Sequence, residues 1–268
     1  MDILALLPPE IREGVGAISR ESPLTEAEYA QLKADGYNEL PGDLEGYDCP
    51  ICRNKGRVMY VAEDGECRLR DCECSAKRRT MRNLARSGLS QTIEICTWET
   101  WQNREPWQEK LYRSARDYAE HPEGWFMAAG NPGTGKTHIC TAICGDFLRS
   151  GKEVRYLLWR DFTTRAKAVL TDAEAYQDLV EPMKRVPVLY LDDLFKTGKG
   201  QEPTTGDVNL AFELINARYA DPRKLTIIST ELPISAILEI DEAVGSRIYE
   251  RCKAHYADLS GRMNWRMQ

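Results

Sequence analysis

Long apolar runs are missing from this sequence, and so is a recognisable targeting segment. None of its apolar stretches is long enough to cross a bilayer, which argues against a transmembrane helix. The N-terminus is acidic, and its brief apolar patch from Ile3 to Leu7 is too short for a signal peptide, so we expect a cytoplasmic protein. An excess of positive charge is missing as well, because the formal net charge is −6. With 42% apolar residues over 268 positions, the sequence predicts a globular protein of one or two domains.

The charge is distributed unevenly along the chain. Residues 1–48 hold 3 basic and 11 acidic side chains, whereas residues 49–90 hold 10 basic and 5 acidic ones. The remainder, 91–268, is close to neutral with 23 basic and 26 acidic side chains. This pattern predicts three parts with different tasks. They are an acidic N-terminal arm or helix (1–44), a basic module (45–90) and a main domain (91–268).

The acidic arm contains one helix signal. Thr25 followed by Glu28 fits a capping box, and Gly36 fits a helix end, so we predict a helix from about Thr25 to Ala34. A flexible acidic arm is the alternative.

A glycine-rich segment follows the apolar run 125–129. It fits the pattern of a glycine, four residues and Gly-Lys-Thr, at a point where a strand would turn into a helix. The glycines let successive N–H groups converge on phosphate oxygens, Lys136 can reach the β- and γ-phosphates, and the Thr137 hydroxyl can hold Mg²⁺. A glycine-rich surface turn is the alternative. The predicted nucleotide-binding residues are Gly130, Asn131, Pro132, Gly133, Thr134, Gly135, Lys136, Thr137 and His138.

A second segment, residues 186–194, is an apolar run that leads into two carboxylates, Asp192 and Asp193. Such a run is typical of a buried parallel strand, whose C-terminal end lies at the sheet edge where α/β proteins bind ligands. We expect Asp192 to orient Mg²⁺ and Asp193 to act as general base on the attacking water. An acidic turn after a strand is the alternative. Together with Lys136, the two carboxylates predict the catalytic centre of a nucleoside triphosphatase.

Five of the nine cysteines lie in the basic module. Cys49 and Cys52 form a CxxC pair and Cys72 and Cys74 a CxC pair, with 19 residues between the pairs. Two close thiolate pairs joined by a short hairpin predict a tetrahedral Zn²⁺ site in a zinc-ribbon-like domain. A redox pair is the alternative for the CxxC, but the second pair favours metal. The fifth cysteine, Cys67, could replace Cys72 or Cys74 as a ligand.

Basic and aromatic residues connect the cysteine module to the main domain. The basic side chains between Lys77 and Arg86 lie on a predicted helix, where they either contact phosphate or form a solvated face. Three tryptophans follow, Trp98, Trp101 and Trp107. They could lie beside a nucleotide base, but we expect them to pack in the core.

Strands and helices alternate through the main domain. We predict strands over 125–129, 153–159, 186–193 and 225–230, and helices over 136–149, 161–181, 207–219 and 233–240. This alternation predicts an α/β fold, a parallel sheet flanked by helices on both faces. We expect the strand that ends at Thr230 and Glu231 to lie beside the Asp192 strand, so that a polar side chain there could sense a γ-phosphate.

The order of these motifs resembles that of AAA+ ATPases of the DnaC/DnaI helicase-loader type, most of all their phage and prophage versions. The resemblance rests on the loop Gly130–Thr137, the strand end Asp192–Leu194, and the segments 227–232 and 245–251. The cysteine module is similar to the zinc-binding N-terminal region of DnaI-like loaders. The resemblance covers residues 45–268.

The resemblance implies roles for individual residues. The phosphate loop would be Walker A, Asp192 and Asp193 would be Walker B, and Thr230 or Glu231 would stand at sensor 1. Arg247 would be an arginine finger inserted into a neighbouring subunit's ATP site, although a salt bridge on a helix surface is the alternative. Many relatives carry Asp-Glu at Walker B, so the shorter second acid here would slow hydrolysis. The resemblance also implies an AAA+ P-loop NTPase domain without a C-terminal lid domain.

The function that the resemblance implies is ATP-dependent loading of a hexameric DnaB-type replicative helicase onto single-stranded DNA during replication. It implies ATP, Mg²⁺ and Zn²⁺ as cofactors, self-assembly that depends on ATP, and no membrane partner. The zinc module and the acidic arm would bind the helicase. An IstB-like transposition helper, which binds duplex DNA and a transposase, is the first alternative, although such helpers usually lack a zinc module. A small-molecule P-loop kinase is the second, but we locate neither a lid nor an acceptor pocket for it.

Overall fold

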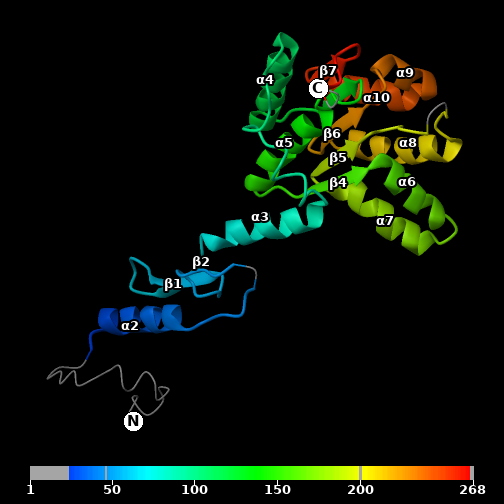
Figure 1. Cartoon of the computed structure of the whole chain (residues 1–268). Coiled ribbons are helices and arrows are strands. Elements are labelled where there is room, and N and C mark those ends of the chain that lie inside the picture. Colours follow the sequence, from blue (N-terminus) through cyan, green and yellow to red (C-terminus); the bar gives the residue numbers. More distant parts are fainter. Residues whose placement is uncertain (1–23, 46, 199–200, 266–268) are drawn as a thin grey trace. The chain divides into compact units, whose positions relative to one another are not determined.

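The structure, a computed structural model, describes residues 24–45, 47–198 and 201–265. The chain divides into two compact units between Ser75 and Ala76 (Figure 1). This division falls within one helix, α3 (Cys74–Ser87). No helix in the described part of the chain is long and apolar enough to span a membrane.

The first unit contains α2 (Glu26–Glu39) and an antiparallel hairpin of β1 (Arg57–Val61) and β2 (Cys67–Asp71). The helix begins with the predicted capping box, in which the Thr25 hydroxyl accepts the Glu28 N–H and the Glu28 carboxylate accepts the Thr25 N–H. The predicted end at Ala34 is wrong, because the helix continues through Gly36 to Glu39. Tertiary contacts explain the extension. The Asn38 amide donates to the carbonyl of Met59 on β1 and accepts its N–H, at 2.8 and 2.9 Å.

The second unit is a five-stranded sheet in the order β4-β5-β6-β3-β7, with every neighbouring pair parallel. Its strands are β3 (Phe126–Gly130), β4 (Val154–Leu158), β5 (Val188–Asp192), β6 (Leu225–Thr230) and β7 (Tyr256–Leu259). Its helices, besides α3, are α4 (Pro106–Glu120), α5 (Lys136–Arg149), α6 (Trp159–Ala168), α7 (Ala173–Arg185), α8 (Thr205–Tyr219), α9 (Ile234–Ile240) and α10 (Glu242–Cys252). The predicted parallel α/β fold is confirmed, including the pairing of β5 with β6.

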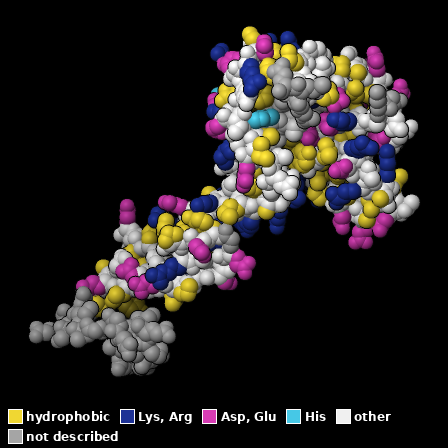
Figure 2. All heavy atoms as spheres, in the orientation of Figure 1, with side chains coloured by type: hydrophobic (Ala, Val, Ile, Leu, Met, Phe, Trp, Pro, Cys, Tyr) yellow, Lys and Arg dark blue, Asp and Glu magenta, His cyan; other side chains and the backbone are white. Residues whose placement is uncertain are grey.

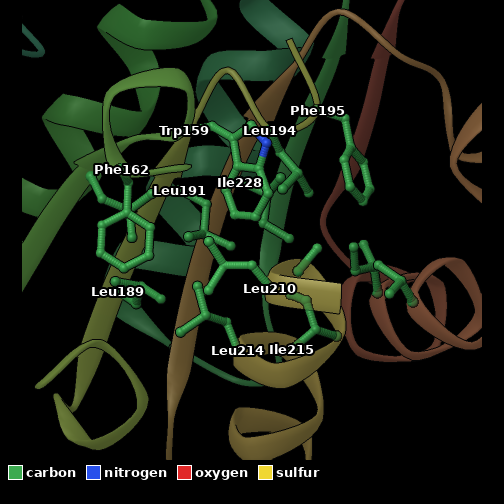
Figure 3. Packing of buried hydrophobic residues seen from close by; sticks show 14 of the residues in the cluster. Trp159, Phe162, Leu189, Leu191, Leu194, Phe195, Leu210, Leu214, Ile215 and Ile228 are labelled. Carbon is green, nitrogen blue, oxygen red and sulfur yellow. The ribbon is translucent and has the colours of Figure 1, made fainter. Parts of the chain in front are cut away.

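Two hydrophobic cores cover the two faces of this sheet, because successive side chains of a strand point to opposite faces. On β5, Leu189 and Leu191 belong to the core shared with α8, whereas Val188 and Tyr190 belong to the core shared with α5. Figure 3 shows the first of these cores, where side chains of β5 and β6 meet leucines of α8 and the rings of Trp159 and Phe162 on α6. Burial on both faces fixes the ends of the central strands, where the predicted site lies.

Three elements of the second unit were not predicted, and one prediction was too coarse. No element was predicted where α4, α10 and β7 lie, and α6 and α7 were predicted as one helical stretch. The strand β7 is short and partly polar, and its place depends on pairing with β3 across more than 120 residues, with Ala129 opposite Asp258. Local periodicity carries no signal for such a strand.

Candidate functional site

The predicted phosphate loop joins β3 to α5 and is tightly packed. Gly130, Gly133 and Gly135 have φ angles of +127°, +74° and +87°, which favour glycine. A Cβ at Gly130 would lie 2.3 Å from the backbone of Leu259 on β7, and one at Gly133 would lie 1.7 Å from the side chain of Asn264. Gly135 is the N-cap of α5, so the free N–H groups of the first helical turn lie at the loop. The segment is therefore a tightly packed loop and not a loose glycine-rich surface turn.

Lys136 lies inside the loop. Its Nζ donates to the carbonyl oxygens of Gly130 at 2.7 Å and Asn131 at 2.8 Å, and the side chain is buried. Burial lowers the pKa of Lys136, while the charges of Glu231 and Asp193 oppose that shift. The ammonium group is therefore held where the loop curls.

Thr137 and Asp192, the predicted magnesium ligands, are brought together from α5 and β5. The Thr137 hydroxyl donates to the Asp192 carboxylate at 3.4 Å. A hydroxyl and a carboxylate are oxygen ligands of the kind that Mg²⁺ takes beside substrate phosphates. These two side chains therefore fit a magnesium site.

Besides Thr137, three further hydroxyl groups hold the Asp192 carboxylate, which is only 4% exposed. It accepts hydrogen bonds from Tyr190 at 2.8 Å, from Tyr156 at 3.0 Å and from Ser229. Sequence reasoning missed these partners, although strand periodicity offered a signal. Tyr190 stands two residues before Asp192 and hence on the same face of β5. Tyr156 is the residue of β4 that lies opposite Tyr190.

Asp193 and Glu231 are joined by a residue that the sequence analysis did not single out, Lys196. Its Nζ lies 3.0 Å from the Asp193 carboxylate and 2.8 Å from that of Glu231. Asp193 has a φ of +56°, and its N–H donates to the Ser229 hydroxyl at 3.1 Å. Two lysines, Lys136 and Lys196, thus line the same cavity as these two carboxylates.

Thr230, the other predicted sensor residue, is the last residue of β6 and does not line the cavity. It is fully buried, its hydroxyl donates to the carbonyl of Leu194 at 2.8 Å, and it accepts the N–H of Leu232 at 3.1 Å. These bonds hold β6 against the end of β5. The structure therefore brings Glu231, rather than Thr230, to the cavity.

Two adjoining cavities flank the phosphate loop. The first, the phosphate cavity of about 380 Å³, is lined by Cys96, Pro132, Gly133, Gly135, Lys136, Thr137, His138, Asp193, Lys196, Glu231 and Trp265. The second, the tryptophan cavity of about 460 Å³, is lined by Thr100, Trp101, Gln102, Arg104, Gln108, Gly133, Thr134, Gly135, His138 and Trp265. The two cavities adjoin at the loop, because both are lined by Gly133 and Gly135.

The tryptophans separate into core and cavity residues. Trp98 is buried in the core, as expected, but Trp101 lines the tryptophan cavity. Its ring stands 2.7 Å from the place of a Cβ on Gly135 and meets the His138 ring edge-on at 5.4 Å. Trp265, from the other end of the unit, also lines this cavity, and the Arg104 guanidinium lies 5.2 Å from its ring.

Four cysteines come together in the first unit. The Sγ atoms of Cys49, Cys52, Cys72 and Cys74 lie within 4.8 Å of one another, and all four side chains are buried. A tetrahedral Zn²⁺ with Zn–S bonds of about 2.3 Å needs sulfur atoms about 3.8 Å apart. The Cys49–Cys72 and Cys52–Cys74 distances of 3.7 and 3.5 Å are close to that value. The cluster therefore fits zinc.

Burial raises the pKa of the Cys72 thiol, whereas the pKa of the Cys52 thiol in the same cluster is lowered. Burial raises the pKa of the Cys52 thiol, but the Gly56 N–H at 3.3 Å and the neighbouring thiols lower it, to about 6 overall. Thiolate is the form that binds metal. Cys67 lies outside the cluster, where its thiol donates to the carbonyl of Ala30 at 3.2 Å.

Arg247 lies on α10 and lines neither cavity of its own chain. It donates to the Ala243 carbonyl at 2.7 Å, and its guanidinium lies 5.3 Å from the Phe212 ring and 5.6 Å from the Tyr219 ring. Its Nε is buried without a hydrogen-bond partner. Within the described part of the chain it makes no ion pair, so the helix-surface salt bridge is not observed.

Comparison with known proteins agrees with this geometry. The profile of a family described as "IstB-like ATP binding protein" matches residues 74–260, which is well over half of the chain. The chain belongs to this family of IstB-like ATP-binding proteins. Among curated relatives, it is 28% identical to the uncharacterised protein YqaM of Bacillus subtilis strain 168, over 80% of this chain and 83% of that protein.

The IstB-like protein is also similar to the replicative helicase loader DnaC of Escherichia coli K12. The two are 24% identical over 74% of this chain and 80% of DnaC. A crystal structure of the DnaC helicase loader matches with a TM-score of 0.54 at 24% identity, over 62% of this chain and 97% of that chain. The resemblance to DnaC-type AAA+ proteins, predicted from motif order, is confirmed.

Proposed function

We propose that this IstB-like protein is an ATP-dependent loader of a hexameric DnaB-type replicative helicase onto single-stranded DNA. The observation that carries the proposal is the Lys136–Thr137–Asp192 site, in which Lys136 and Asp192 are buried, in a domain similar to a helicase loader. The separate unit with four clustered cysteines adds a second surface for a partner.

The proposed reaction is hydrolysis of ATP in the phosphate cavity. Lys136 binds the β- and γ-phosphates, and the N–H groups of the first turn of α5 bind the same oxygens. Asp193 accepts a proton from the attacking water, and Glu231, as the sensor residue, orients that water. Mg²⁺, held through Thr137 and Asp192, would neutralise charge on the phosphates. The three hydroxyl groups on Asp192 keep its carboxylate oriented.

The tryptophan cavity supplies the place that we propose for the base. Trp101 stands against Gly135, so a nucleotide whose phosphates enter the loop extends its base past this ring. Stacking on an aromatic ring contributes about 1–3 kcal/mol, which corresponds to about 5- to 150-fold in affinity. We predict that Trp101→Ala weakens binding of a fluorescent ATP analogue by at least about fivefold. Trp107→Ala, at a tryptophan outside the cavity, is the control, and equal affinities of the two variants would contradict the assignment.

Arg247 is proposed to act on the ATP site of a neighbouring subunit. Its guanidinium lies over two aromatic rings at the surface rather than at its own loop, and it can reach out without breaking an ion pair. An arginine inserted from a neighbour stabilises the charge of the transition state and couples hydrolysis to assembly.

Mixing two inactive variants tests this role. Lys136→Ala subunits have a defective ATP site but keep Arg247. Arg247→Ala subunits keep an intact ATP site but lack the arginine that would act on a neighbour. We expect each variant alone to hydrolyse ATP at a few per cent of the wild-type rate or less, and an equal mixture to recover about a quarter of it, as random pairing of neighbours predicts. Arg251→Ala is the matched control, because Arg251 also stacks on Tyr219. A mixture as inactive as its components would show that Arg247 does not act between subunits.

The first unit is proposed to hold the helicase. Several of its hydrophobic side chains are exposed, and Figure 2 shows hydrophobic side chains among acidic ones on the visible face of this unit. Tyr29 and Leu32 on α2 and Ile51 beside the cysteine cluster are the largest of them by exposed fraction. Exposed apolar side chains rimmed by charge are typical of protein-binding surfaces.

A transposition helper remains the second candidate, because the family is named after IstB. A loader should lose its helicase complex when the cysteine cluster is disrupted, whereas a helper should keep duplex DNA binding. Gel filtration of the full chain and its Cys52→Ser variant, each mixed with helicase or with duplex DNA, separates the two functions.

A further inference from the structure

A short turn after β5 places Lys196 at the phosphate cavity. The Lys196 N–H donates to the Asp193 carbonyl at 2.9 Å and closes the turn. Asp193 and Phe195 have φ angles of +56° and +60°, a region that costs side chains energy and that clusters at functional sites. Leu194 and Phe195 anchor the turn in the core (Figure 3). The backbone is thus fixed, whereas the Lys196 side chain reaches into the cavity.

Two carboxylates hold the Lys196 ammonium beside the loop. Its contacts to Asp193 and Glu231 are 3.0 and 2.8 Å, and its side chain is 40% exposed. Burial lowers the pKa of Lys196, but the two carboxylates raise it by more, so the group is charged. Ion pairs with this much solvent contact contribute little, and a phosphate group that carries several negative oxygens can replace them.

We propose that Lys196 is the residue by which this site distinguishes ATP from ADP. The γ-phosphate draws the ammonium away from Asp193 and Glu231, and ADP, which lacks that phosphate, leaves the ion pairs intact. The inference rests on the proposed ATPase function and adds a residue that binds and stabilises the transferred group.

The movement of Lys196 from Asp193 to the γ-phosphate also determines when Asp193 can act as the general base. While Lys196 is paired with Asp193, its ammonium occupies the carboxylate that would accept the proton of the attacking water. Once the ammonium contacts the γ-phosphate, Asp193 takes a proton as the water oxygen bonds to the γ-phosphorus and the bond from that phosphorus to the bridging oxygen breaks. ADP leaves with the electron pair of that bond, inorganic phosphate forms, and the proton is released from Asp193. Lys196 meanwhile neutralises charge on the γ-phosphate oxygens.

A second lysine of the same unit provides a matched comparison. Lys184 also bridges two carboxylates, with Nζ 2.9 Å from Glu181 and 2.5 Å from Glu213, but it lines neither cavity. If Lys196 were only a structural ion pair, changing either lysine would have the same kind of effect.

The experiment compares affinities for ADP and for a non-hydrolysable ATP analogue in the full chain. We expect wild type to prefer the analogue, and Lys196→Met to lose about 10- to 100-fold in affinity for it, the effect of one charge-assisted hydrogen bond. Affinity for ADP should stay within about twofold, and kcat should fall. Lys196→Arg should keep part of the preference because it keeps the charge. Lys184→Met should behave as wild type in all of these measurements.

Three outcomes would overturn the inference. Equal losses for both nucleotides, or no loss for either, in a Lys196→Met protein with the wild-type melting temperature would show that Lys196 does not sense the γ-phosphate. Wild type that hydrolyses ATP without preferring the analogue over ADP would refute the inference but leave the ATPase function standing. Wild type that binds neither nucleotide would instead refute the proposed function, and the inference with it.

Discussion

Lys136→Ala should abolish ATP hydrolysis by this protein, with a loss of at least about 100-fold in kcat/KM. The ammonium of Lys136 is buried where the loop curls and is held by the carbonyl groups of Gly130 and Asn131. A phosphate that enters the loop meets this charge away from bulk water, where charge–charge interactions are strongest. Alanine removes this buried charge from the loop.

The loop itself should survive the change. The Thr134 hydroxyl still donates to the carbonyl of Asn131 at 2.9 Å, and the Asn131 amide still donates to that of Arg262 at 3.2 Å. The melting temperature without nucleotide should therefore stay within a few degrees of wild type, and ATP should no longer raise it. Phosphate release measured over a range of ATP concentrations provides kcat/KM. A Lys136→Ala protein that hydrolyses ATP like wild type would show that the catalytic site lies elsewhere.

Cys52→Ser should unfold the first unit and abolish its zinc binding. Besides the four cysteines, the hydrophobic cluster of this unit contains Val58 and the partly buried Tyr47, and α2 adds two buried alanines, Ala30 and Ala34. So small a core does not stabilise a domain by itself, whereas structural zinc contributes on the order of 10 kcal/mol. Losing one of four ligands therefore removes most of the stability of the unit.

Cys67→Ser is the matched control, since Cys67 lies outside the cluster. Metal analysis should find zinc in wild type and Cys67→Ser and almost none in Cys52→Ser. Limited proteolysis should then cut Cys52→Ser within the first unit, while its ATPase activity stays within about twofold because every residue of the phosphate cavity belongs to the second unit. Zinc retained by Cys52→Ser, or lost by Cys67→Ser, would refute the assignment of ligands.

The local parts of the site could be predicted from the sequence. The phosphate loop and the Asp192–Asp193 strand end are contiguous motifs whose geometry follows from glycine conformations and strand burial. The cysteine cluster was equally accessible because its two pairs have the spacing of metal ligands. The order of the motifs then predicted the family.

The remaining parts depend on contacts between distant segments. The pairing of β5 with β6 was predicted, but nothing in the sequence near Lys196 indicates that its side chain will contact both Asp193 and Glu231. Trp265 and Trp101 meet across more than 160 residues at a cavity that no motif marks. The choice between Thr230 and Glu231 likewise depended on which of the two side chains faces the core.

Loading of helicase onto closed circular single-stranded DNA tests the central proposal most directly. A circle has no end to thread, so a hexameric ring binds it only after being opened. Helicase, circular DNA and this protein are mixed with ATP and Mg²⁺, and the helicase that elutes with the DNA on gel filtration is measured. We expect wild type to increase that amount several-fold over helicase alone, and Lys136→Ala or omission of ATP to prevent the increase. An amount of DNA-bound helicase that wild-type protein does not change would contradict the proposal that this protein is a loader.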